Sequence, residues 1–217
     1  VVKANGYGHG AAPIARMIEK KDYLWGFAAA TIEEAAELRR NGIQKPILIL
    51  GYVFPEDYEE LVRLDIRPTV FRLDMAKELS AEAVRQQKEV SVHIKVDTGM
   101  SRIGFADTKE SVQDVCAISK LPGIRMEGLF THFAKSDELD KAATEKQLAR
   151  YCAFREACEA AGVKFQIHHC SNSAGIIDLP EANLDMVRAG ITVYGLYPSD
   201  EVKKELVPLR PAMEMKS

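Results

Sequence analysis

The chain lacks the features that would place it in a membrane or on a nucleic acid. No apolar run in its 217 residues approaches the roughly 20 residues that a membrane-spanning helix needs. The longest candidate, Pro46 to Leu50, is predicted to be a buried strand. The net charge is −3, the pI is near 6.0, and basic residues are interspersed with acidic ones. We therefore expect neither a membrane nor a nucleic-acid partner.

Cysteine is scarce, and its four copies lack the spacing of a zinc or redox motif. Cys116, Cys152, Cys158 and Cys170 form no Cys-x-x-Cys pair, and three of them have apolar neighbours. Such residues are typical of reduced thiols, so we expect a cytoplasmic protein. The chain also lacks a signal peptide and an initiator methionine. Because it opens at Val1 inside an apolar stretch, we expect further residues upstream.

What the chain does contain is a regular alternation of short apolar runs and amphipathic helical patterns. The runs are mostly continuous rather than alternating, as in parallel strands that are covered on both faces. An uninterrupted repeat of roughly eight βα units favours an α/β fold of the (β/α)8 barrel type over an open doubly wound sheet. The predicted strands are Val1–Ala4, Trp25–Ala29, Pro46–Leu50, Arg67–Phe71, Val90–Val96, Met126–Phe130, Phe165–His169 and Met186–Ala189.

Several helices carry recognisable end signals. Thr31 and Glu34 are spaced as a capping box, and Gly42 is predicted to end the same helix. Asp107 with Glu110, and Thr144 with Gln147, have the same spacing and predict two further helix starts. We assign residues 1–200 to the barrel. Residues 201–217 are largely extended and interrupted by proline, and we expect them to lead toward a second domain.

Polar residues follow the apolar runs, at the end where the active sites of such barrels gather. Lys3 is the most informative of them. A lysine at the end of a buried strand is costly unless it is paired or used covalently, and a desolvated amine suits Schiff-base chemistry. The structural alternative is a packed stem with its ammonium in solvent. The other polar residues are Asn5, Tyr7, His9, Lys95, Asp97, Arg102, His132, His169, Asn172, Ser173, Arg188, Gly190 and Tyr194.

Two kinds of ligand suit these residues to different degrees. Loops after strands seven and eight commonly bind phosphate in this fold, and Ser173 and the backbone near Gly190 would suit a phosphate ester. Arg188 could instead be a structural ion-pair partner. His132 and His169 lack the carboxylate or thiolate that would complete a zinc spacing, so no metal is expected.

Taken together, these segments resemble the alanine racemase family over essentially the whole chain. Five motifs follow in the order and spacing of that family. They are Val-Val-Lys3-Ala-Asn-Gly-Tyr7-Gly-His-Gly, Lys95-Val-Asp-Thr-Gly-Met-Ser-Arg102-Ile-Gly, Thr-His132-Phe, Cys-Ser-Asn172-Ser173-Ala and Val-Arg188-Ala-Gly190-Ile191. The resemblance implies a pyridoxal 5′-phosphate (PLP) enzyme that interconverts L- and D-alanine and supplies bacterial peptidoglycan precursors.

The resemblance also implies a role for each matched residue. Lys3 would bind PLP covalently and act as one of two acid/base groups. The phosphate would be held by Tyr7, Ser173, Gly190 and Ile191, and Asn172 is grouped with them as a cofactor contact.

Four further positions carry implied roles around the cofactor ring. Arg188 would face the pyridine nitrogen, and His132 would lie against the ring. Arg102 would approach the phenolic oxygen and the substrate carboxylate. Lys95 matches a lysine that is carbamylated in some members of the family.

The chain departs from the family pattern in two ways. Gly6 stands where alanine is usual, a mild change. The family's C-terminal β-domain, which carries the second acid/base tyrosine and completes a head-to-tail homodimer, has no counterpart here. We therefore expect these residues alone to bind the cofactor poorly or incompletely and to be inactive as a racemase.

The sequence leaves alternatives open. A single-domain PLP-binding protein of cofactor homeostasis shares the lysine strand and the phosphate loops. A cofactor-free lysine aldolase is a third reading. Alanine is the expected substrate, with serine or a broader set open, because one methylene changes the discrimination by only about 1–3 kcal/mol.

Overall fold

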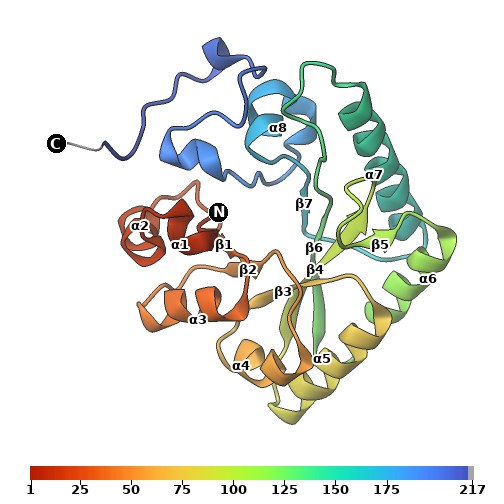
Figure 1. Ribbon diagram of the computed structural model, residues 1–217. Coiled ribbons are helices and arrows are strands. Elements are labelled where there is room, and N and C mark those ends of the chain that lie inside the picture. The colour runs from red at the N-terminus through yellow and green to blue at the C-terminus, as the bar shows by residue number, and fades with distance from the viewer. Residues whose placement is uncertain (215–217) are drawn as a thin grey trace.

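The computed structural model describes residues 1–214 and shows a curled sheet of parallel strands with helices on its outer face (Figure 1). The strands pair in the order β1-β2-β3-β4-β6-β7, and the short β5 pairs with β4. Every pairing is parallel. The strands are β1 (Phe27–Ala29), β2 (Ile47–Ile49), β3 (Arg67–Val70), β4 (Val90–Asp97), β5 (Phe105–Ala106), β6 (Ile124–Phe130) and β7 (Ile167–His169).

Helices connect successive strands and cover the sheet, which confirms the α/β barrel class (Figure 1). The apolar side chains of both layers form one large core, in which β2 and nearly all of β4 are buried. The helices are α1 (Lys3–Tyr7), α2 (Ala11–Ile18), α3 (Ile32–Arg40), α4 (Tyr58–Arg63), α5 (Leu73–Arg85), α6 (Lys109–Ile118), α7 (Ala142–Ala160) and α8 (Ser173–Asp178). Short 3-10 turns are η1 (Pro55–Asp57), η2 (Pro180–Ala182), η3 (Ile191–Tyr194) and η4 (Lys204–Leu206).

Six of the eight predicted strands are regular strands, whereas the first and last are not. The amide of Val2 donates to the carbonyl of Ala28 at 2.8 Å, and the amino group of Val1 donates to the carbonyl of Ala189 at 2.7 Å. The amide of Arg188 in turn donates to the carbonyl of Ser171 at 3.0 Å. The two segments thus bridge β7 to β1 through isolated hydrogen bonds. The prediction of regular strands at 1–4 and 186–189 was wrong because the chain turns away at Lys3 before a ladder can form.

The three predicted capping boxes had different outcomes. The prediction at Asp107 was wrong by one residue, because Thr108 is the N-cap of α6 and its Oγ1 accepts from the amide of Ser111 at 3.3 Å. Thr31 is the N-cap of α3, and its Oγ1 accepts from the amide of Glu34 at 3.5 Å. Thr144 was predicted as a cap but is a buried residue inside α7. That helix starts earlier because Asp140 Oδ1 accepts the amide of Ala142 at 2.9 Å.

The last part of the chain runs as an extended segment over the α8 side of the molecule (Figure 1). The hydroxyl of Tyr197 anchors it, because it donates to the carbonyl of Val207 at 2.9 Å and accepts from the amide of Leu209 at 3.1 Å. The last three residues of the predicted connection, 215–217, lie outside the described residues. Among residues 1–214, no helix combines the length and the apolar character of a membrane span.

Candidate functional site

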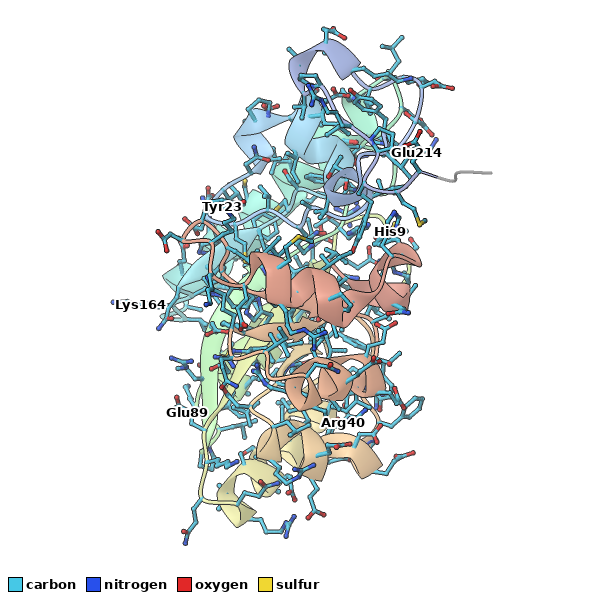
Figure 2. All side chains as sticks on the ribbon, turned by 90° about the vertical axis from the view of Figure 1, so that its left-hand side faces the viewer. His9, Tyr23, Arg40, Glu89, Lys164 and Glu214 are labelled. Atoms are coloured by element: carbon cyan, nitrogen blue, oxygen red, sulfur yellow. The ribbon has the colours of Figure 1, made fainter. Side chains whose placement is uncertain are left out.

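The residues singled out from the sequence gather at one end of the barrel. Figure 2 shows His9, which follows the first apolar run, on the opposite side of the sheet from Tyr23, Glu89 and Lys164, which precede β1, β4 and β7. The side that carries His9 is therefore the carboxyl-terminal end of the strands. This is the end at which (β/α)8 barrels assemble their active sites.

Lys3 opens an unusual left-handed turn. Ala4, Asn5, Gly6 and Tyr7 have φ angles of 50°, 50°, 64° and 52°. This region costs an L-residue roughly 1–2 kcal/mol, and glycine much less. The turn is closed by hydrogen bonds from the Gly6 amide to the Val2 carbonyl at 2.7 Å and from the Gly8 amide to the Ala4 carbonyl at 3.0 Å.

Glu34 braces this turn against the neighbouring strand. Its Oε1 accepts from the amide of Ala4 at 2.7 Å, and its Oε2 accepts from the amide of Ala30 at 2.8 Å. The first amide directly follows Lys3, and the second follows β1. The carboxylate therefore fixes the backbone that carries Lys3 relative to the sheet.

Replacing Glu34 with alanine is expected to free the Ala4 amide and lower the free energy of unfolding by about 1–3 kcal/mol, because two amides lose a charged acceptor. Hydrogen exchange at Ala4 should accelerate in this variant. Glu33→Ala, at the exposed neighbour, is the matched control and should leave that amide protected. Unchanged exchange at Ala4 in Glu34→Ala would contradict this role.

Tyr7, Ser173 and Gly190 form a small polar cradle. Ser173 Oγ accepts from the amide of Gly190 at 3.0 Å and lies 3.1 Å from Thr192 Oγ1. A Cβ on Gly190 would lie only 2.9 Å from the hydroxyl oxygen of Tyr7. Glycine thus keeps open a space bordered by the hydroxyl groups of Tyr7 and Ser173, and Ile191 begins η3 beside it. Sequence reasoning missed Thr192, although it lies directly after the matched motif.

Arg188 is buried and held entirely by neutral acceptors. Its Nη1 donates to His169 Nδ1 at 2.8 Å, and its Nη2 contacts His132 Nδ1 at 3.3 Å. Burial lowers the pKa of Arg188 to about 10, so the guanidinium stays charged at neutral pH. Its backbone acceptors are the carbonyls of Thr131, His169 and Cys170.

The surroundings of His132 show how cationic the site is. Burial, followed by the charges of Arg188, Arg102, Lys95 and Lys3, lowers the pKa of His132 to about 3. The imidazole is therefore neutral at physiological pH. Four positive side chains converge at this end of a chain whose net charge is −3, so the site suits an anionic ligand.

Lys95 and Arg102 occupy different environments within this cationic group. Lys95 is only 2% exposed, and its Nζ lies 5.8 Å from the centre of the Phe130 ring. Burial, with the charges of Arg102 and Arg188, lowers the pKa of Lys95 to about 8. Arg102 is exposed, and it forms no ion pair within residues 1–214. The sequence did not single out Phe130, which stacks on His169 with ring centroids 4.6 Å apart.

Asn172 has a local structural task. Its Oδ1 caps α8 by accepting from the amide of Gly175 at 3.0 Å, and it also accepts from the hydroxyl of Ser136 at 2.8 Å. The side-chain oxygen is therefore occupied. Asn172 positions Ser173 at the start of α8.

The comparison with protein families identifies the chain. The model of "Alanine racemase, N-terminal domain" matches residues 1–198. The chain belongs to this family. Curated relatives include the alanine racemases of Desulforamulus reducens, 46% identical, and Clostridium perfringens, 48% identical, each over the full chain. The chain spans 58% and 56% of the lengths of these two proteins.

Solved structures of the alanine racemase family share the fold. The enzyme of Clostridium difficile 630 in complex with cycloserine superposes with a TM-score of 0.95 at 45% identity. This match covers 97% of the present chain and 58% of that protein. The Bacillus anthracis enzyme with bound L-Ala-P has a TM-score of 0.90 at 32% identity, over 97% of this chain and 54% of that protein. The homeostasis-protein alternative gains no support from these relatives.

Proposed function

We propose that the chain is the cofactor-binding barrel of a PLP-dependent alanine racemase. The observation that carries this proposal is the cationic end of the barrel, where Lys3, a neutral His132 and a buried Arg188 lie beside a hydroxyl cradle. Bound there, PLP supplies an electron-withdrawing ring that acidifies the α-proton of an amino acid.

The residues present fit this group. The space kept open at Gly190 is bordered by the hydroxyls of Tyr7 and Ser173, which suit a phosphate ester. Asn172 contributes by positioning Ser173, and the start of η3 at Ile191 supplies a further amide. Lys3, on the braced left-handed turn, is the amine that would hold the cofactor covalently and move the α-proton on one face.

The cationic side chains have distinct tasks in this proposal. Arg188 would face the ring nitrogen, and because a guanidinium keeps its proton, that nitrogen would stay unprotonated. The neutral imidazole of His132 steadies Arg188 through their 3.3 Å contact. Arg102 is free to meet a substrate carboxylate.

The whole activity requires more than these residues. The chain covers 56–58% of its curated relatives, and we propose that the second acid/base lies in the portion it does not match. Residues 201–217 would lead toward that C-terminal domain, and the complete protein would work as a homodimer. We place this activity in peptidoglycan supply in the bacterial cytoplasm, where the four unpaired cysteines stay reduced. Alanine is the proposed substrate.

A chimaera tests the proposal. The matching part of the Clostridium difficile alanine racemase is replaced by this chain, and D-alanine formation from L-alanine is measured. Activity in the chimaera, together with none in the isolated 217-residue chain, is expected. A folded chimaera that binds PLP but fails to racemise alanine would refute the substrate assignment, and one that does not bind PLP would refute the cofactor assignment.

Ser173→Ala is expected to weaken PLP binding about 10–100-fold, because a hydrogen bond to a charged group contributes about 1.5–3 kcal/mol. Binding of pyridoxal, which lacks the phosphate, should change little. Absorbance titrations with both compounds measure the difference. An equal loss for both compounds would show that Ser173 does not contact the phosphate.

Lys95 is proposed to carry a carbamate. With a pKa of about 8, roughly one tenth of the amine is neutral at pH 7 and able to attack carbon dioxide. Carbon-13-labelled bicarbonate should give a carbamate signal in the NMR spectrum that is absent from Lys95→Gln. The exposed lysine variant Lys164→Gln is the control and should retain the signal.

A further inference from the structure

A row of buried side chains leads from Arg188 to Glu127 in the middle of β6. His169 Nδ1 lies 2.8 Å from Arg188 Nη1, and His169 Nε2 lies 2.9 Å from His93 Nδ1. His93 Nε2 lies 3.1 Å from Glu127 Oε2. These four residues are between 0% and 6% exposed. They come from β7, β4, β6 and the segment after β7, so the row crosses the interior of the sheet.

The hydrogen bonds along this row have a single consistent direction. Arginine can only donate, so His169 Nδ1 accepts and His169 Nε2 carries the proton. His169 then donates to His93 Nδ1, and His93 Nε2 donates to Glu127. Burial lowers the pKa of both histidines, which supports their neutral state. With both imidazoles neutral and Glu127 ionised, every donor in the row meets an acceptor.

Glu127 is suited to be the fixed acceptor at the end of the row. Burial alone would raise the pKa of Glu127, but the interactions with His93 and then the charge of Arg67 lower it below its ordinary value. Arg67 Nε lies 3.4 Å from Oε2, and Arg125 Nη2 lies 3.3 Å from Oε1. The carboxylate therefore stays ionised and can accept from His93.

The row also joins two buried charged groups, Arg188 and Glu127, that are not in direct contact. Within residues 1–214, no carboxylate forms an ion pair with Arg188, whose direct partners are imidazoles and carbonyls. Glu127 is the carboxylate that reaches it, through two imidazoles. In an interior of low dielectric, such a chain of hydrogen bonds polarises each member.

We propose that Glu127 and His93 are positioning residues for the cofactor site, because they reinforce from the other side the tautomer of His169 whose Nδ1 accepts from Arg188. Residues in the middle of β4 and β6 thereby contribute to the orientation of the guanidinium. The tautomer assignment follows from contacts within the protein and needs no bound ligand. Its link to a cofactor ring rests on the function proposed above.

The test is nitrogen-15 NMR of the imidazoles in the ligand-free 217-residue chain. The chain has only five histidines, so single replacements assign each ring. Protonated and unprotonated ring nitrogens resonate far apart, which reports the tautomer directly. In the wild-type chain, His93 and His169 should each show a protonated Nε2 and an unprotonated Nδ1. A protonated Nδ1 on His169 would overturn the proposal without any variant.

Glu127→Leu removes the acceptor while keeping a similar volume. Since His93 Nε2 then has no partner, His169 is expected to leave its single tautomer, and its two nitrogen signals should shift toward each other. Glu127→Gln, which restores an acceptor, should return the wild-type pattern. The matched control is Glu89→Leu, because Glu89 also pairs with Arg125, at 3.4 Å, but does not reach His93.

An unchanged His169 spectrum in folded Glu127→Leu would overturn the proposal, as would an equal change in Glu89→Leu. A separate PLP titration of the chimaera keeps the two proposals apart. If wild-type tautomers are as stated but PLP does not bind, the proposed function fails and the positioning of Arg188 stands. If PLP binds but His169 has the other tautomer, the positioning of Arg188 fails and the proposed function stands.

Discussion

Lys3→Ala is expected to abolish covalent attachment of PLP and to lower racemisation by the chimaera at least about 1,000-fold. One amine serves both as the attachment point and as an acid/base group, and acid/base catalysis alone contributes about 100–10,000-fold. Two measurements check this: the absorbance band of the lysine-bound cofactor, and the protein mass after borohydride reduction. Both should report one bound cofactor in the chimaera with Lys3 and none in the chimaera with the variant.

The control for this experiment is Lys20→Ala, an exposed lysine next to α2. It should retain the absorbance band, the added mass and the activity. A variant at Lys3 that still gains the mass of the cofactor would place the attachment at another lysine. The left-handed turn at Lys3 is closed by backbone hydrogen bonds, which do not need the lysine side chain. Circular dichroism should therefore show the same fold in both variants.

Arg188→Ala is expected to lower the free energy of unfolding by about 3–5 kcal/mol. The guanidinium is buried, and its removal leaves two imidazole nitrogens and three carbonyls without their donor and opens a cavity. Urea denaturation of the isolated chain measures this loss. Arg40→Ala, at the exposed arginine labelled in Figure 2, should change the stability by less than about 0.5 kcal/mol.

Arg188→Lys distinguishes the charge from the shape of the guanidinium. Lysine keeps the positive charge but cannot span His169 and His132 at once. We expect the free energy of unfolding of Arg188→Lys to lie between those of the wild type and Arg188→Ala. Stability equal to the wild type would mean that the charge alone matters, and that the fork geometry of Arg188 has no structural role.

The sequence alone determined the class of the fold and predicted most residues of the candidate site. Continuous apolar runs identified β1 to β4, β6 and β7, because a strand that is buried on both faces is apolar along nearly its whole length. The polar residues after these runs include Lys3, Lys95, Ser173 and Arg188, which the structure brings to one end. Family motifs then supplied the expected cofactor, which local periodicity could not.

Tertiary structure decided how those residues are held. The left-handed turn after Lys3 was not predicted from the sequence, because Ala4 and Asn5 seldom adopt positive φ angles and the Glu34 carboxylate that accepts the Ala4 amide lies 30 residues away. Likewise, His93 lies inside a predicted strand, and its contact with His169 joins positions that are 76 residues apart. Strand and helix patterns report neighbours within a few residues. Contacts between strands depend on packing in three dimensions, and only the folded chain reveals them.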